Sequence, residues 1–125
     1  MKKAMVSAVL LASLLAILTG CGGWRQREAP EINSNAYSAV LLDNNQVYFG
    51  KLDKAGSAYP VLTDVYYIQS QVNQETKAVT NILVRRGNEW HGPDRMILNA
   101  RHILLIEPVG PNSKVAQLIE ADKKK

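Results

Sequence analysis

The sequence predicts a mainly β protein, in which about five short strands form a small sandwich or barrel and a short helix follows at the C-terminus. Apolar runs with strand-like alternation recur between residues 37 and 108, and clusters of Gly, Asn, Asp and Pro separate them. After residue 110 the apolar spacing changes to three and four residues. That spacing indicates a helix, because it places apolar side chains on one helical face.

The first 20 residues have the pattern of an export signal. Lys2 and Lys3 are followed by a run rich in Ala and Leu, and no charged residue occurs from Ala4 to Trp24. A charged start, an apolar stretch and small residues at its end are typical of a cleaved signal peptide. The alternative is a retained transmembrane helix, which needs about 20 apolar residues. The run is only marginally long enough, and it ends among glycines.

The segment Leu18-Thr19-Gly20-Cys21 resembles the lipobox of bacterial envelope lipoproteins. The resemblance implies that the Cys21 thiol receives a diacylglyceryl group and that the chain is cut between Gly20 and Cys21. The new amino terminus is then acylated, so two or three acyl chains, palmitate among them, would anchor the protein stably. The alternative is that Cys21 forms a disulfide bond, but it has no partner within the chain, because it is the only cysteine.

The lipobox resemblance also predicts a location. The lipid anchor would hold the protein on a membrane surface that faces away from the cytoplasm. Gly22 occupies the position where an aspartate would resemble an inner-membrane retention signal. For a Gram-negative cell, the expectation is therefore the periplasmic face of the outer membrane.

Residues 21–36 are predicted to be the lipidated cysteine and a flexible tether. The stretch GGWRQREAPEINSNA has Gly, Pro, Asn, Ser and charges without an apolar period. Removal of the signal takes Lys2 and Lys3 away, so the 15 basic residues fall to 13 against 11 acidic ones. So small a positive excess does not imply a nucleic-acid partner.

The strands of the predicted domain, residues 37–109, follow from the turn clusters. DNNQ separates the first two strands, DKAGSAYP precedes the third and NQETKA precedes the fourth. These residue types end strands because they favour turn conformations. The loop GNEWHGPDR then leads to two short apolar runs. The predicted strands are Tyr37–Leu42, Gln46–Leu52, Val61–Gln71, Val79–Arg86 and a final pair near Met96–Leu98 and His102–Pro108.

Gly50 lies inside the second predicted strand. A glycine weakens a strand unless the chain bends sharply there or another backbone comes close, and small barrels need such corners. The strand Tyr48-Phe49-Gly50-Lys51-Leu52 follows an apolar strand and a turn, and this pattern resembles that of Sm-like and SH3-like barrels. The resemblance implies a five-stranded barrel. Since Sm-like barrels often pair edge strands into rings, it also makes a homo-oligomer an open alternative.

The Sm-like resemblance does not extend to the RNA-binding positions of that family. Asn99-Ala100-Arg101 lies near the last turn, where RNA-binding members have Arg-Gly, and no counterpart of their loop asparagine is found. An exported protein also meets little RNA. The sequence therefore disfavours a nucleic-acid partner.

The predicted helix lies within residues 110–125 and ends in a basic tail. Val115, Leu118 and Ile119 share one helical face, and Asn112 or Ser113 can cap its start. The terminal lysines suit the negative end of the helix dipole. Two interpretations remain open: the helix covers one open end of the barrel, which such stripes usually do, or it binds a partner.

The residues offer little catalytic chemistry. His91 and His102 are the only histidines, and a metal site needs three or four ligands. His91 with Glu89 and Asp94 forms one loose group, for which a solvated loop is the commoner explanation. The serines lack a nucleophile elbow and no phosphate-binding loop occurs. We therefore expect no enzyme activity, no metal and no cofactor beyond the lipid on Cys21.

Binding is the remaining prediction. Trp90, on the loop NEWHGPD, is the best candidate for an exposed aromatic anchor, and the alternative is that it folds back into the core. Tyr66 and Tyr67 could extend such a surface, since adjacent strand residues point to opposite faces and one should face outward. Two functions follow as hypotheses: an envelope adaptor that binds another protein, or a binder of peptidoglycan or another glycan.

Overall fold

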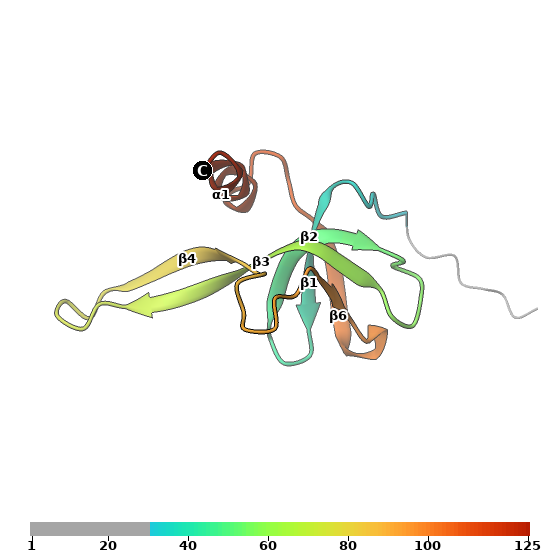
Figure 1. Ribbon diagram of the computed structural model, residues 1–125, viewed down its shortest axis with the longest axis horizontal. Helices are drawn as coiled ribbons and strands as arrows, with labels where there is room; N and C mark the ends of the chain where they lie inside the picture. Colours follow the sequence, from blue (N-terminus) through green and yellow to red (C-terminus); the bar gives the residue numbers. More distant parts are fainter. Residues whose placement is uncertain (1–30) are drawn as a thin grey trace, which may run out of the picture.

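The computed structural model describes residues 31–125, which form one antiparallel β-sheet and one C-terminal helix (Figure 1). The mainly β class and the C-terminal helix are therefore confirmed. The predicted signal peptide, Gly20 and Cys21 of the lipobox, and the tether up to residue 30 lie outside the described residues. The elements are β1 (Tyr37–Leu42), β2 (Val47–Asp53), β3 (Val61–Val72), β4 (Val79–Arg85), β5 (Arg95–Ile97), a 3-10 turn (Ala100–His102), β6 (Ile103–Pro108) and α1 (Lys114–Lys123).

The sheet has six strands rather than five, and it does not close into a barrel. The strand order is β4-β3-β2-β1-β6. The strand β5 pairs with the first part of β3, along the same edge on which β4 pairs with the second part. The two predicted final strands are present as β5 and β6, but they do not pair with each other: β5 pairs with β3 and β6 with β1. The 3-10 turn separates them: the Asn99 side chain accepts the Arg101 N–H and redirects the chain. β4 pairs only with the second half of β3, so no ladder joins β4 to β6 in residues 31–125.

The long strand β3 bends at Asp64, opposite Gly50. Phe49 pairs with Tyr66 and Lys51 with Thr63, so β3 has one extra residue at this point. Asp64 takes a left-handed backbone conformation, with φ of 51°, which is the mark of a β-bulge. A Cβ atom on Gly50 would lie 2.7 Å from the Leu62 Cγ and 2.8 Å from the Thr63 carbonyl oxygen. The predicted close approach at Gly50 is confirmed.

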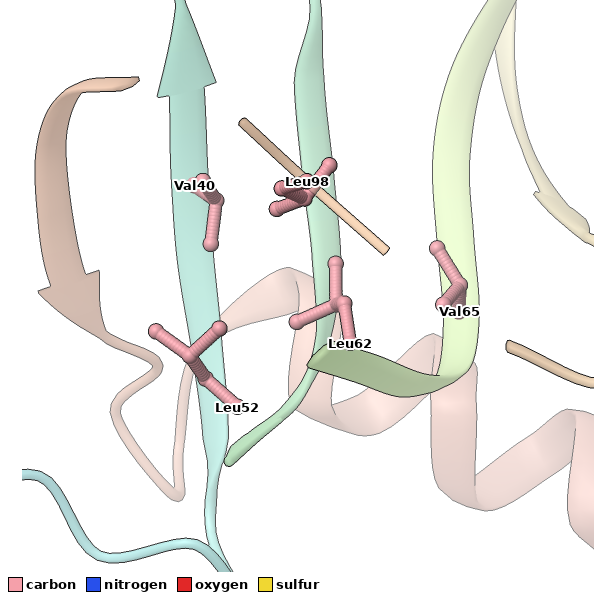
Figure 2. Packing of buried hydrophobic residues seen from close by; sticks show 5 residues of the cluster. All are labelled: Val40, Leu52, Leu62, Val65 and Leu98. Atoms are coloured by element: carbon pink, nitrogen blue, oxygen red, sulfur yellow. The ribbon is translucent and has the colours of Figure 1, made fainter. Parts of the chain in front are cut away.

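One face of the bent sheet encloses the main core. Five residues form the buried cluster, and each is at most 6% exposed: Val40, Leu52, Leu62, Val65 and Leu98. Figure 2 shows their side chains converging from β1, β2, β3 and the segment after β5. The bulge matters here, because it returns Val65 to the same face as Leu62 although Val65 lies three positions further along the chain, which in a regular strand would place it on the opposite face. Tyr66 consequently points to the other face.

The helix α1 packs against that other face, over β3 and β4 (Figure 1). Ser113 is its N-cap, and the Ser113 hydroxyl accepts the Ala116 N–H at 3.1 Å, as one of the two predicted caps. Ile119 is 1% exposed, so the predicted apolar face is the buried one. Tyr66 donates its hydroxyl to Asp122 Oδ2 at 3.3 Å. The helix thus packs against its own domain, as the first interpretation expects, although it covers a face of the sheet rather than the open end of a barrel.

Candidate functional site

Trp90 is presented on a tightly held turn between β4 and β5. The Gly87 N–H donates to Glu89 Oε2 at 2.7 Å, and the Gly92 N–H donates to the Glu89 carbonyl at 2.8 Å. Gly87 and Gly92 both have positive φ angles, which the turn needs. Glu89 therefore ties both ends of the turn. The Trp90 side chain is fully exposed, at 107% of its reference area, so it does not fill the core.

The electrostatics of the turn centre on Glu89. The backbone N–H of Gly87 is the largest cause that lowers the pKa of the Glu89 carboxyl, and the positive charge of Arg86 lowers it further. The Arg86 Nε lies 3.0 Å from Glu89 Oε1, and the Arg86 guanidinium lies 5.9 Å from the centre of the Tyr48 ring. The turn that carries Trp90 is thereby connected to the sheet.

The two predicted tyrosines do not join Trp90 in one aromatic surface. Tyr66 is fully buried beneath α1. Tyr67 is half-buried on the opposite face, where its ring meets the Tyr48 ring edge to face at 6.4 Å between centroids. The prediction that adjacent tyrosines face opposite ways is correct, but Tyr66 offers no surface for stacking. Tyr59, 63% exposed, is the more accessible tyrosine.

A hollow of about 530 Å³ lies beside this turn, and the charged groups that line it already have partners of opposite charge. Arg85 and Asp64, and likewise Arg95 and Asp94, each approach to 3.0 Å. The hydrogen bond from Arg95 is the main cause that lowers the pKa of Asp94. Arg86, the third arginine of the lining, pairs with Glu89 at the same distance. Because all three arginines already have carboxylate partners, the hollow provides little net attraction for an anion.

The described residues contain no group of three or more His, Cys, Asp or Glu side chains placed to hold a metal ion. The loose group predicted around His91 is divided: Glu89 is engaged by the turn, and Asp94 by Arg95. The other histidine, His102, places its Nδ1 2.6 Å from Asp43 Oδ2 on an exposed surface.

A polar cluster around Asp64 joins the sheet to α1. The Tyr37 hydroxyl donates to Asp64 Oδ2, and Lys123 Nζ lies 3.6 Å from the same oxygen. Arg85 holds the other carboxylate oxygen. Burial is the largest cause that raises the pKa of Tyr37, and the hydrogen bond to Asp64 adds to it. Burial likewise raises the pKa of Tyr66 to about 12.

These raised pKa values predict a loss of stability at alkaline pH. Unfolded tyrosine ionises near pH 10, whereas folded Tyr66 ionises near pH 12. The stability that protonated Tyr66 contributes to the folded state is therefore fully present below about pH 10. It declines as pH rises toward 12, because over this range the tyrosine of the unfolded chain has already lost its proton. Urea unfolding midpoints across this window should fall less steeply in Tyr66→Phe than in the wild type. An equal slope in both proteins would contradict the assignment.

The β3–β4 hairpin projects beyond the rest of the sheet (Figure 1). Every residue from 68 to 81 is exposed. Ile68, Val72 and Val79 lie on one face of it, since Ile68 and Val72 alternate along β3 and Val72 pairs with Val79. We call these three residues the hairpin stripe; they are 50%, 51% and 65% exposed. In the described chain no further strand pairs with the outer edge of β4 along the hairpin.

A second exposed apolar area lies at the other end of the sheet, around β6. Leu104 and Leu105 are 62% and 41% exposed. They border a hollow of about 460 Å³, which is lined by Glu31, Ile32, Ile103, Leu104, Leu105 and Pro108 among others. We call this area the β6 hollow. The sequence pattern predicts β6 as a strand but contains no signal for its position at the end of the sheet.

The chain matches no protein-family model, and no curated protein is significantly similar to it. In residues 31–125 no helix combines the length and the apolar character that a membrane span requires.

Proposed function

We propose that this chain is a lipid-anchored envelope lipoprotein without enzymatic activity, whose β domain binds another protein as an adaptor or accessory subunit. The anchor is supported by the export-signal pattern and by the lipobox-like Leu18-Thr19-Gly20-Cys21. Its predicted place is a membrane face outside the cytoplasm, the outer membrane in a Gram-negative cell. Nucleic acid is not among the proposed partners.

The observation that favours a protein partner is the hairpin stripe. A two-stranded ribbon is at best marginally stable in water when no third layer covers it, yet this hairpin extends from the sheet with its apolar side uncovered. Covering the half-exposed Ile68, Val72 and Val79 would contribute on the order of 1 kcal/mol each. The open edge of β4 offers backbone groups to a partner strand in addition.

We also propose that the domain is an open variant of the SH3-like or Sm-like barrel. In support, β1, β2 and β3 form an antiparallel meander. The segment that follows β4 then pairs with both outer strands of this meander, with β3 through β5 and with β1 through β6. The 3-10 turn interrupts that run.

Site-specific crosslinking tests the protein-binding proposal. A photoreactive residue at position 72 should crosslink to one protein species in intact envelopes, whereas the same residue at position 71 should not. Val72 and Gln71 are neighbours, both exposed, and their side chains point to opposite faces. The paired substitution Val72→Thr and Val79→Thr should abolish the product of a crosslinker placed elsewhere on the hairpin. A product of twice the chain mass would identify a homo-oligomer, and equal products at 71 and 72 would refute the stripe.

A glycan-binding function is the second candidate, and it is favoured by the fully exposed indole of Trp90 on its tightly held turn. Such a side chain offers a large flat surface at little cost in conformational entropy. Purified peptidoglycan should then retain the wild-type protein and not Trp90→Ala. Because Trp90 is exposed, the variant should keep its unfolding free energy within about 0.5 kcal/mol. Equal retention of both proteins would exclude this function.

A further inference from the structure

The described chain begins at the β6 hollow. Glu31 and Ile32 are part of the hollow's lining, and Ile32 also packs against the core cluster. The segment that precedes Glu31 therefore joins the domain at this place. In Figure 1 the β6 end of the sheet and the start of the described chain lie on the right, and the hairpin tip lies on the left.

The hollow is apolar for a structural reason. Leu41 pairs with Leu105 and Leu42 with Ile103, so Leu104 has no partner residue on β1 and is displaced from the ladder. An exposed leucine in a bulge of an edge strand buries little area against its own sheet. With Leu105 and Ile106 next to it, the bulge leaves a run of apolar residues along the outer edge of the sheet.

The length of the preceding chain limits what can cover this surface. Glu31 lies ten positions after Cys21, and at about 3.5 Å per position the chain between them spans at most about 35 Å. If Cys21 is acylated, as the proposed function requires, the bilayer surface is always within that reach of the hollow. A short tether of this kind gives the bilayer a high effective concentration at the hollow, so even a weak apolar contact between the two is formed most of the time.

We propose that the β6 hollow is a membrane-docking surface: Leu104 and Leu105 enter the interfacial layer of the bilayer that holds the lipid on Cys21. Glu31 is the one charged residue of the hollow's lining, so the apolar side chains and not charge attraction would carry this contact. The docked domain directs the β3–β4 hairpin away from the membrane, toward a partner. This inference rests on the proposed lipid anchor.

Depth measurement with a fluorescent label tests the inference on the full lipidated protein. An acylated Cys21 has no free thiol, so Leu104→Cys introduces the one reactive site, and Thr80→Cys on the exposed hairpin is the matched control. Both proteins are purified from membranes and reconstituted into vesicles of phosphatidylethanolamine and phosphatidylglycerol that carry a headgroup-level quencher. The emission of the label at position 104 should shift to the blue, because the bilayer interface is less polar than water. The headgroup-level quencher should also remove most of its intensity. The label at position 80 should show neither the shift nor the quenching.

The outcomes separate the two proposals. An acylated protein whose label at position 104 behaves like the one at position 80 would overturn membrane docking and leave the lipid anchor intact. Self-quenching at position 104 that grows with protein density would show that a second copy covers the hollow, which also overturns docking. An intact mass without acyl chains would overturn the lipid anchor and docking together.

Discussion

The Gly50→Ala variant is expected to lose about 1–3 kcal/mol of unfolding free energy, and Gly50→Val more, because overpacking a tight contact forces neighbours out of place. The new Cβ atom would lie 2.7 Å from the Leu62 Cγ and 2.8 Å from the Thr63 carbonyl oxygen. The carbonyl belongs to the backbone of β3, and Leu62 is fully buried. Neither group can move without disturbing the bulge or the core.

Urea unfolding of the two variants beside Gly110→Ala measures this effect. Gly110 has no heavy atom within 4 Å of an added Cβ, so its substitution should change the unfolding free energy by no more than about 0.5 kcal/mol. A Gly50→Ala protein as stable as the Gly110→Ala protein would show that β2 and β3 do not approach as closely as described.

The role of Gly50 could be predicted from the sequence because a glycine inside an apolar strand is a local signal. The strands and the capped helix are predictable for the same reason: alternation, turn residues and the N-cap of Ser113 are all properties of neighbouring residues. The pairing of β5 with β3 and of β6 with β1 has no such local signal. It depends on the short 3-10 turn and on contacts between residues far apart in the chain.

The candidate binding surface is predictable to a lesser degree. The composition of its loop leaves Trp90 either exposed or folded into the core, and the exposure follows from a turn held by Glu89. Alternation along β3 predicts that Tyr66 and Tyr67 face opposite ways. The sequence does not indicate which of them is buried, since that depends on where α1 docks. One local feature indicates the projecting hairpin, namely the length of β3. This strand has 12 residues, and β2 pairs only with its part from Val61 to Tyr67.

Asp64→Ala is expected to lower the unfolding free energy by about 2–4 kcal/mol, through two separate effects. Hydrogen bonds to a charged group contribute about 1.5–3 kcal/mol when they are sheltered from water, and the Asp64 carboxylate accepts one from Tyr37. The left-handed backbone at Asp64 also suits Asp better than Ala, for which it costs about 1 kcal/mol. Arg85 adds little, because its side chain is 54% exposed and its ion pair is screened by solvent.

Two further variants separate these effects. Asp64→Gly accepts the left-handed backbone and loses only the carboxylate, so it should be more stable than Asp64→Ala by about 1 kcal/mol. Asp64→Asn keeps both the backbone tolerance and an oxygen for the Tyr37 hydroxyl, and should be the least destabilised of the three. Urea unfolding gives the three values, and equal losses would mean that neither the backbone conformation nor the acceptor at Asp64 matters.

Hydrogen exchange shows where the stability is lost. Asp64 binds Lys123 of α1 as well as Tyr37 of β1, so its removal should loosen the helix before it loosens the sheet. The α1 amides should therefore exchange faster in Asp64→Ala, while the amides of Val40 and Leu52 in the main core keep their protection relative to global unfolding. Arg85→Gln, which removes only the exposed partner, should leave α1 exchange near the wild-type rate. If Asp64→Ala and Arg85→Gln release α1 equally, the exposed ion pair holds the helix and the cluster with Tyr37 and Lys123 does not.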